Sequence, residues 1–243
     1  MTPTILITRP DPAGALFADA IRQRVGCGVA IEISPLLKIV FAGELPDLDG
    51  ITRLIFTSRN GVEAFARASD RRDITCYCVG DATAQVARDH GLTAISSSGA
   101  ADDLVVRVQS DAVTGPCLHI RGDRSVGDIA RRLGASGIPT SEAVLYRQVP
   151  NPLSDQAQRL LRGDGPVILP LFSPRTAQLF FANGKGRPKM TVVALSAAVA
   201  AMVPDGFDGE LIVAERPDAA AMLDVIQRLV DQGKSLETGK RAQ

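Results

Sequence analysis

Aromatic residues are scarce in this chain of 243 residues: tryptophan is absent, and phenylalanine and tyrosine number 8 and 2. Because proteins that bind single-stranded nucleic acid stack its bases on aromatic side chains, this scarcity argues against such a surface. Net charge is also absent, since 27 lysines and arginines balance 27 aspartates and glutamates. A neutral chain has no overall field to attract a polyanion or a membrane surface. We therefore expect no nucleic acid and no membrane as partners, and any anionic ligand must be held locally.

Long hydrophobic runs are missing as well. The apolar stretches are far shorter than a membrane span requires. The first residues lead directly into the strand-like Ile5-Leu6-Ile7, without the basic flank and apolar core of a secretory signal. We expect a cytoplasmic protein. Its 45% hydrophobic and 22% charged residues are an ordinary soluble composition, and the length suits one large domain or two small ones.

Metal ligands and catalytic imidazoles are few. Cys76 and Cys78 fall on one face of a predicted strand, which admits a metal or redox role. Zinc-ligand spacing and clustered histidines are both missing, so reduced core thiols are the preferred interpretation and we predict no metal site. The histidines are His90, at a predicted helix end, and His119, inside a predicted strand. Neither has a nucleophile and a partnering acid nearby in sequence, so both are interpreted as structural.

The most informative segment is LIFTSRNGVEAF at 54–65. It reads as a short buried strand, a turn at Thr57 and Ser58, and a helix whose apolar face includes Val62 and Phe65. The hydroxyl of Thr57 or Ser58 is suited to accept hydrogen bonds from the free amides of the first helical turn. Those amides, with the positive end of the helix dipole, also suit an anion. The alternative is ordinary helix capping without a ligand.

An internal repeat strengthens the ligand interpretation. LPLFSPRTAQLF at 169–180 matches 54–65 at an offset of 115, and ALSAAV at 194–199 falls on VGDATA at 79–84 at the same offset. Residues 120–127 likewise follow 7–14 at an offset of 113. The chain therefore has the order A, B, A′, B′.

Strands and helices alternate along the whole sequence, which is typical of parallel sheets covered by helices on both faces. The order of the repeats predicts one discontinuous α/β domain from residues 1–35 and 151–243, and a second α/β domain at 42–142. The connections at 36–41 and 143–150 are extended in character, so we expect them to pair as a two-stranded antiparallel ladder. A tandem division near residue 115 is the alternative, but it leaves both connections without partners.

Several segments together resemble the uroporphyrinogen-III synthase family. They are ILITRP at 5–10, FTSRNGV at 56–62, VGDATA at 79–84, IRG at 120–122, VLYR at 144–147 and FSPRT at 172–176. The resemblance covers nearly the whole chain. It implies two flavodoxin-like domains, the first discontinuous, joined by a β-ladder with the active site between them.

The resemblance also implies a reaction and a substrate. Linear hydroxymethylbilane closes to uroporphyrinogen III, with loss of water and inversion of the last pyrrole ring. No cofactor is implied, and we expect a monomer whose partner is this small molecule. Departure of the substrate hydroxyl gives an azafulvene-like cation, and attack at a substituted ring carbon gives a spiro intermediate. Because uncatalysed closure gives the wrong isomer, the main task of the enzyme is positioning.

Ligands of parallel sheets bind beyond the carboxyl ends of the strands. The polar residues predicted there as substrate ligands are Arg9, Thr57, Ser58, Asn60, Thr83, Arg121, Ser173, Arg175 and Ser196. The alternative for each hydroxyl is capping or turn formation, and for each arginine a solvated surface charge. Together the three arginines form a plausible carboxylate-binding rim.

Tyr146 is the predicted catalytic residue, since its phenol is suited to donate a proton or hydrogen bond to the departing hydroxyl and the family carries an important tyrosine at this connection. The alternative is an amphipathic side chain that covers the ladder. Two positions depart from the family pattern: Ala197 and Ala198 stand where threonines are frequent, and Asn60 where arginine is. Two other functions therefore stay open, a non-enzymatic two-domain binder of a small anion and a catalytically decayed paralogue.

Overall fold

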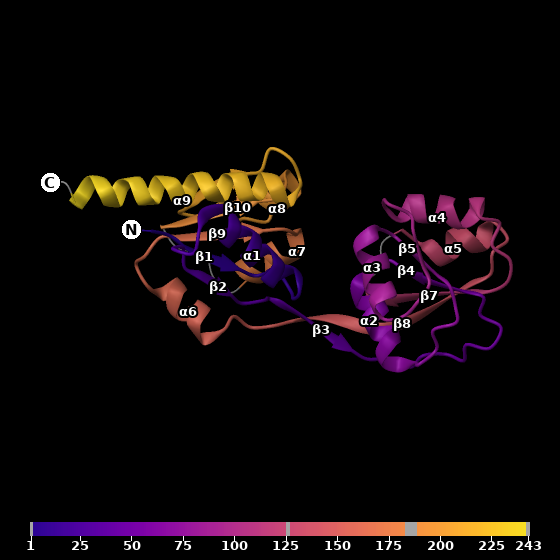
Figure 1. Ribbon diagram of the computed structural model, residues 1–243. Coiled ribbons are helices and arrows are strands. Elements are labelled where there is room, and N and C mark those ends of the chain that lie inside the picture. Colours follow the sequence, from indigo (N-terminus) through magenta and orange to yellow (C-terminus); the bar gives the residue numbers. More distant parts are fainter. Residues whose placement is uncertain (1, 125–126, 183–188, 242–243) are drawn as a thin grey trace. The chain divides into compact units, whose positions relative to one another are not determined.

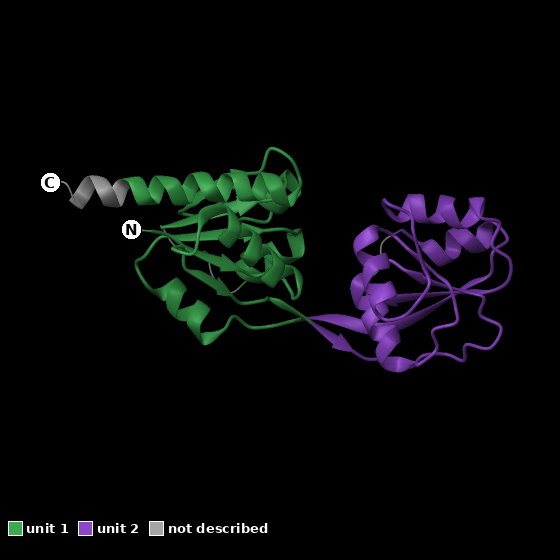
Figure 2. Ribbon diagram, viewed as in Figure 1, with its two compact units in different colours: residues 1–38, 150–243 green, residues 39–149 purple. Residues whose placement is uncertain are grey.

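The computed structural model describes residues 2–124, 127–182 and 189–241, with side chains up to residue 235. The chain divides into two compact units (Figure 2). Unit 1 comprises Met1–Lys38 and Pro150–Gln243, and unit 2 comprises Ile39–Val149. In the described part of the chain, no helix combines the length and the apolar character needed to cross a membrane.

Unit 1 is a parallel sheet in the order β11-β10-β9-β1-β2, with helices on both faces (Figure 1). Its strands are β1 (Thr4–Ile7), β2 (Ile31–Ile33), β9 (Val167–Leu171), β10 (Met190–Ala194) and β11 (Glu210–Val213). Its helices are α1 (Ala13–Val25), α6 (Asp155–Arg162), α7 (Pro174–Phe181), α8 (Ala197–Ala200) and α9 (Ala219–Arg241). Ile5 and Ile7 of β1 face the core under α1 and α9, and Leu6 faces the core under α6, α7 and α8. Burial on both faces accounts for the continuous apolar runs of these strands.

Unit 2 is built in the same way, in the order β3-β8-β7-β4-β5-β6. Its strands are β3 (Leu37–Phe41), β4 (Arg53–Phe56), β5 (Cys76–Cys78), β6 (Ala94–Ser96), β7 (Cys117–Gly122) and β8 (Thr140–Pro150). Its helices are α2 (Arg59–Ala68), α3 (Asp81–Asp89), α4 (Ala101–Ser110) and α5 (Ile129–Ala135). Residues of α2 and α3 form one core with the sheet, and residues of α4 and α5 form the other on the opposite face (Figure 1).

The internal repeat corresponds to a repeat of the fold. The offset of 115 pairs β4 with β9 and β5 with β10, and the offset of 113 pairs β1 with β7. With β6 matched to β11 and β8 to β2, the two sheets have the same strand order, and unit 2 carries β3 in addition. The chain enters the two copies at different strands, which is why unit 1 is assembled from both ends of the sequence.

The predicted fold class is confirmed, including the antiparallel pairing of β3 with β8. Beside this ladder, the amide of Ala42 donates to the carbonyl of Leu145 at 3.0 Å. The ladder is not a free-standing connection, because β8 also pairs in parallel with β7 from Thr140 to Tyr146. The strand that carries Tyr146 is therefore fixed on both of its edges.

Candidate functional site

Each sheet has one point at which the chain reverses the direction of strand addition. It lies between β1 and β9 in unit 1 and between β7 and β4 in unit 2. The crevice outside the carboxyl ends of the strands at this point is where α/β sheets bind ligands. Arg9 and Ser173 follow the two strands of unit 1, and Ser58 follows β4 in unit 2. These three predicted ligands stand at the switch points together with Thr57, directly after β4, and Arg121, near the end of β7.

Ser58 and Tyr146 meet at the switch point of unit 2. Ser58 is the N-cap of α2, and its Oγ accepts the backbone N–H of Gly61 at 3.2 Å. The same Oγ lies 2.8 Å from the hydroxyl of Tyr146 on β8. Tyr146 is only 5% exposed and packs in the core beneath α2 and α3. The ring of Tyr146 is therefore buried between the sheet and these helices, and its hydroxyl contacts Ser58 at the end of β4.

Gly122 makes room for the Tyr146 ring. The register between β7 and β8 shifts at Arg121 and Gly122, and this irregularity sets Gly122 opposite Tyr146. A Cβ on Gly122 would lie 2.6 Å from Cε2 and 2.7 Å from Cζ of the Tyr146 ring. Only a residue without a side chain allows the ring to lie against the backbone there.

A polar chain crosses the opposite face of the same sheet. The Oγ1 of Thr57 lies 3.4 Å from Nε2 of His119, and Nδ1 of His119 lies 3.2 Å from Oε1 of Glu142. The other oxygen of Glu142 pairs with Arg121 at 2.9 Å. His119 is fully buried, with 0% exposure. Burial lowers the pKa of His119 below its ordinary value, against the opposing effect of Glu142, so the imidazole is neutral at neutral pH.

Arg121 is engaged within unit 2. Besides the Glu142 pair, its Nη1 donates to the carbonyl of Gly122 at 2.9 Å, and its buried Nε has no hydrogen-bond partner among the described residues. Arg121 therefore already holds Glu142 and the Gly122 carbonyl within its own unit. Its role as a carboxylate ligand stays a prediction.

Unit 2 has a cavity of about 600 Å³ at the end of β4. Thr57 and Ser58 line it together with Val79, Ala100 and Ala101. Its charged lining is Arg124 and Asp102, and Asp102 pairs with Arg132 at 2.7 Å. Most of the other lining side chains are therefore small and apolar.

Unit 1 presents an arginine on an aromatic platform. The guanidinium carbon of Arg9 lies 3.9 Å from the ring centroid of Phe172 and 5.8 Å from that of Phe17. The two rings meet edge to face, with centroids 4.8 Å apart. Because Phe172 directly follows one switch-point strand and Arg9 follows the other, the stacking holds the cation at the crevice. Next to Arg9, the fully buried hydroxyl of Thr8 has no hydrogen-bond partner among the described residues.

The remaining predicted ligands lie at or just inside the N-termini of helices in the two units. Ser173 caps α7, and its Oγ accepts the amide of Thr176 at 3.1 Å and lies 2.8 Å from the Thr176 hydroxyl. Arg175 lies in the first turn of α7, and Ser196 is the N-cap of α8 without a side-chain cap bond. Asn60 lies half-buried in the first turn of α2, and Thr83 is 6% exposed inside α3.

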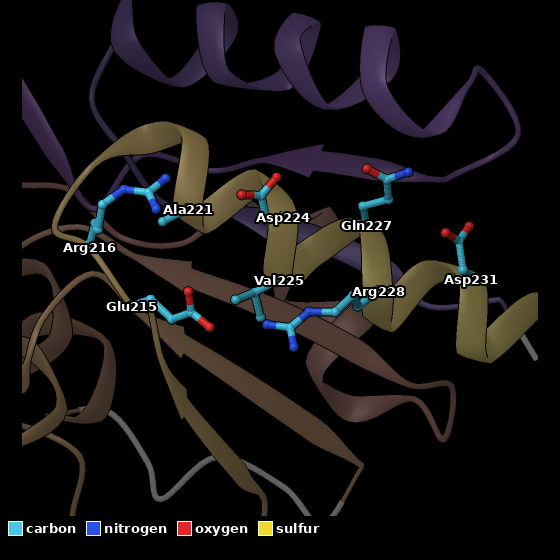
Figure 3. A pocket seen from close by; sticks show the side chains of 8 residues that line it. All are labelled: Glu215, Arg216, Ala221, Asp224, Val225, Gln227, Arg228 and Asp231. Atoms are coloured by element: carbon cyan, nitrogen blue, oxygen red, sulfur yellow. The ribbon is translucent and has the colours of Figure 1, made fainter.

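Another hollow lies along α9 in unit 1 and holds none of the predicted ligands (Figure 3). Its volume is about 340 Å³, and its lining mixes acids with arginines, including Glu215, Asp224 and Arg228. Arg24 of α1 pairs with Asp224 beside it. Across the described residues, no group of three or more His, Cys, Asp or Glu side chains is arranged to hold a metal ion.

Sequence reasoning missed the polar partners of Thr57. His119 was interpreted as structural, and Glu142 was not singled out. The parallel register sets His119 directly beside Glu142 on β8. A histidine inside a buried strand and a glutamate in the following strand were the available signal, but a single sequence does not reveal which residues are register partners.

Comparison with known proteins gives a family and a fold. The family model described as "Uroporphyrinogen-III synthase HemD" matches residues 18–224. The chain is similar to the crystal structure of uroporphyrinogen-III synthetase from Helicobacter pylori, with 16% identity, a TM-score of 0.67, and coverage of 94% of this chain and 100% of that one. It is also similar to a mutant uroporphyrinogen III synthase from Thermus thermophilus, with 14% identity, a TM-score of 0.52, and coverage of 95% and 99%. No curated protein matches the chain significantly in sequence.

Proposed function

The chain belongs to the uroporphyrinogen-III synthase HemD family, and we propose that it closes linear hydroxymethylbilane to uroporphyrinogen III, with loss of water and inversion of the last pyrrole ring. The observation that carries the chemistry is the pair of hydroxyls of Ser58 and Tyr146, 2.8 Å apart at the switch point of unit 2. We expect the protein to act in the cytoplasm as a monomer and without a cofactor.

Each unit offers possible substrate ligands at its own switch-point edge. The first turns of α2 and α7 direct backbone N–H groups outward, and the positive ends of their dipoles favour carboxylates. Arg9, held over Phe172, offers a cation whose side chain is already ordered, so less conformational entropy is lost on binding. The proposed substrate ligands remain Arg9, Thr57, Ser58, Asn60, Thr83, Arg121, Ser173, Arg175 and Ser196.

The two hydroxyls form a path for one proton. Ser58 Oγ accepts from the Gly61 amide, and a phenol is a stronger acid than an aliphatic hydroxyl, so Tyr146 donates to Ser58. Ser58 then keeps its own proton for the substrate. The C–O bond of the hydroxymethyl group breaks as that proton reaches the leaving oxygen, Tyr146 restores the proton on Ser58, and water departs. The cation left on the bilane is attacked by the last ring, whose orientation decides the isomer, and the proton that ring closure finally releases returns to the oxygen of Tyr146.

Isomer analysis tests the proposed function. Hydroxymethylbilane is generated in a coupled reaction with the purified chain present, and the type I and type III products are separated after oxidation. We expect type III isomer well above the uncatalysed background. Type I isomer alone would refute the proposal, and tight binding of the bilane without turnover would favour the binder or the decayed paralogue to which Ala197 and Ala198 point.

Substitution of Tyr146 tests the proton path. General acid groups contribute about 10²- to 10⁴-fold to rate, so Tyr146→Phe should lower kcat by about 10²-fold with a smaller change in KM. The control is Tyr77→Phe, which removes the other tyrosine hydroxyl of the chain, a donor to Asp111 at 2.9 Å. An unchanged kcat in Tyr146→Phe would remove its acid role.

A further inference from the structure

Glu142 determines the hydrogen-bonding state of His119. Glu142 faces Arg121 with one oxygen at 2.9 Å and His119 Nδ1 with the other at 3.2 Å. An ionised carboxylate accepts hydrogen bonds and donates none. The ring nitrogen that faces it must therefore carry a proton, because two lone pairs at this distance repel. The neutral ring of His119 then has its proton on Nδ1 and a lone pair on Nε2.

The lone pair on Nε2 determines the state of Thr57. Thr57 Oγ1 lies 3.4 Å from this nitrogen, and His119 is the partner that the described residues give to the hydroxyl. Since Nε2 has no proton to donate, the hydroxyl of Thr57 donates to it. What Thr57 has left for a ligand is the lone pairs of its oxygen.

We infer that Thr57 binds its ligand as a hydrogen-bond acceptor, held in that state by His119 and Glu142, and so takes an N–H or O–H donor of the substrate rather than a carboxylate. This inference rests on the proposed function, in which the pyrrole N–H groups and the terminal hydroxyl of the bilane are such donors. His119 and Glu142 act through Thr57 and are positioning residues.

The cavity at the end of β4 agrees with an acceptor at this place. Thr57 lines it beside Val79, Ala100 and Ala101, whose small apolar side chains suit the face of a flat ring. Its charged lining residues are Arg124 and Asp102, and Asp102 is already paired with Arg132 at 2.7 Å.

The neighbouring hydroxyls at the end of β4 thus have opposite roles. Ser58 Oγ accepts from the Gly61 amide and faces the phenol of Tyr146 at 2.8 Å, which leaves its proton for the ligand. The hydroxyl of Thr57 donates a hydrogen bond to His119, and its oxygen accepts a hydrogen bond from the ligand. One substrate ring with a donor and an acceptor side by side would be held in a single orientation, as the choice between two isomers requires.

Nitrogen-15 NMR of histidine-labelled protein tests the acceptor state without turnover. The chain has 2 histidines, so the His119→Gln spectrum assigns both. At pH 7.5 we expect a protonated Nδ1 and an unprotonated Nε2 on His119, and in Glu142→Gln a larger fraction with the proton on Nε2. A proton on Nε2 in the unaltered protein would overturn the inference, even if no type III isomer were formed.

Kinetics of Thr57 variants test the contact with substrate. Loss of one neutral hydrogen bond corresponds to about a 2- to 12-fold change, so Thr57→Val should raise KM for hydroxymethylbilane within that range, while Thr57→Ser should restore it. Glu142→Gln should raise KM in the same direction. The control is Thr52→Val, at the other end of β4, where the hydroxyl donates to the carbonyls of Thr114 and Pro116. An unchanged KM in Thr57→Val would refute the contact between Thr57 and the substrate. If neither the unaltered protein nor any variant formed type III isomer, the proposed function would be refuted instead.

Discussion

The close approach of Gly122 to the Tyr146 ring predicts that one methyl group added at Gly122 displaces the ring and its hydroxyl. In Gly122→Ala, the new Cβ would lie 2.6 Å from Cε2 of Tyr146. Carbon atoms in contact are normally about 3.5 to 4.0 Å apart, so the ring must move by about 1 Å to reach that range. Gly122 pairs with Tyr146 in the sheet, and the backbone has little freedom to move instead.

The displacement has two calculable effects. Forcing an extra methyl group into a packed core costs about 1 to 3 kcal/mol, which should appear as a lower free energy of unfolding. The ring shift also lengthens the 2.8 Å contact between Ser58 Oγ and the Tyr146 hydroxyl. Because a misplacement of about 1 Å can cost about 10²-fold in rate, we expect kcat for uroporphyrinogen III to fall by up to about 10²-fold.

Urea unfolding and the isomer assay measure the two effects separately. The control is Gly134→Ala in α5 of the same unit, because a Cβ there meets no atom within 4 Å. In a helix this change should be neutral or stabilise by about 0.5 to 1 kcal/mol. If Gly122→Ala kept the stability and turnover of the unaltered protein, the packing of Tyr146 on Gly122 would not position the phenol, and the reasoning would be wrong.

Three further outcomes are expected. Since burial lowers the pKa of His119, the folded protein binds fewer protons than the unfolded chain, so stability present above the unfolded pKa of about 6.5 should be lost as pH falls through it, by up to about 1.4 kcal/mol per pH unit. Urea titrations at several pH values should show a smaller loss of unfolding free energy on acidification in His119→Gln, but not in His90→Gln. Equal pH slopes in His119→Gln and the unaltered protein would refute this reasoning. Phe172→Leu removes a cation–π contact worth about 0.5 to 1 kcal/mol and should raise KM by about 2- to 5-fold through Arg9, with little change in kcat; initial rates at varied bilane concentration would reveal a contrary result. A chromogenic thiol reagent should modify Cys27 in the native protein and the other three cysteines, which are buried, only after unfolding, so a second fast-reacting thiol would contradict the packing.

Local patterns in the sequence were sufficient for the elements and the fold class. The strand, turn and helix at 54–65 are observed as β4, the Ser58 cap and α2, since each depends on neighbours within a few residues. The repeat at an offset of 115 identified β9 and α7 as their counterparts, because two copies of one unit preserve spacing. The carboxyl ends of the strands could therefore be predicted as the binding edge before any contact was known.

Contacts between distant residues were beyond the reach of a single sequence. Ser58 and Tyr146 are 88 positions apart, and their hydrogen bond depends on a register shift at Gly122 that no periodicity records. The register of β7 and β8 likewise makes Glu142 the partner of His119 and draws Arg121 into that pair. The sequence by itself determined which residues stand at the end of each strand, because those positions follow from local hydrophobic pattern and turn chemistry. Only the tertiary structure decided which partners their hydroxyls and charged groups contact, because hydrogen bonds depend on distances between strands that the chain order does not fix.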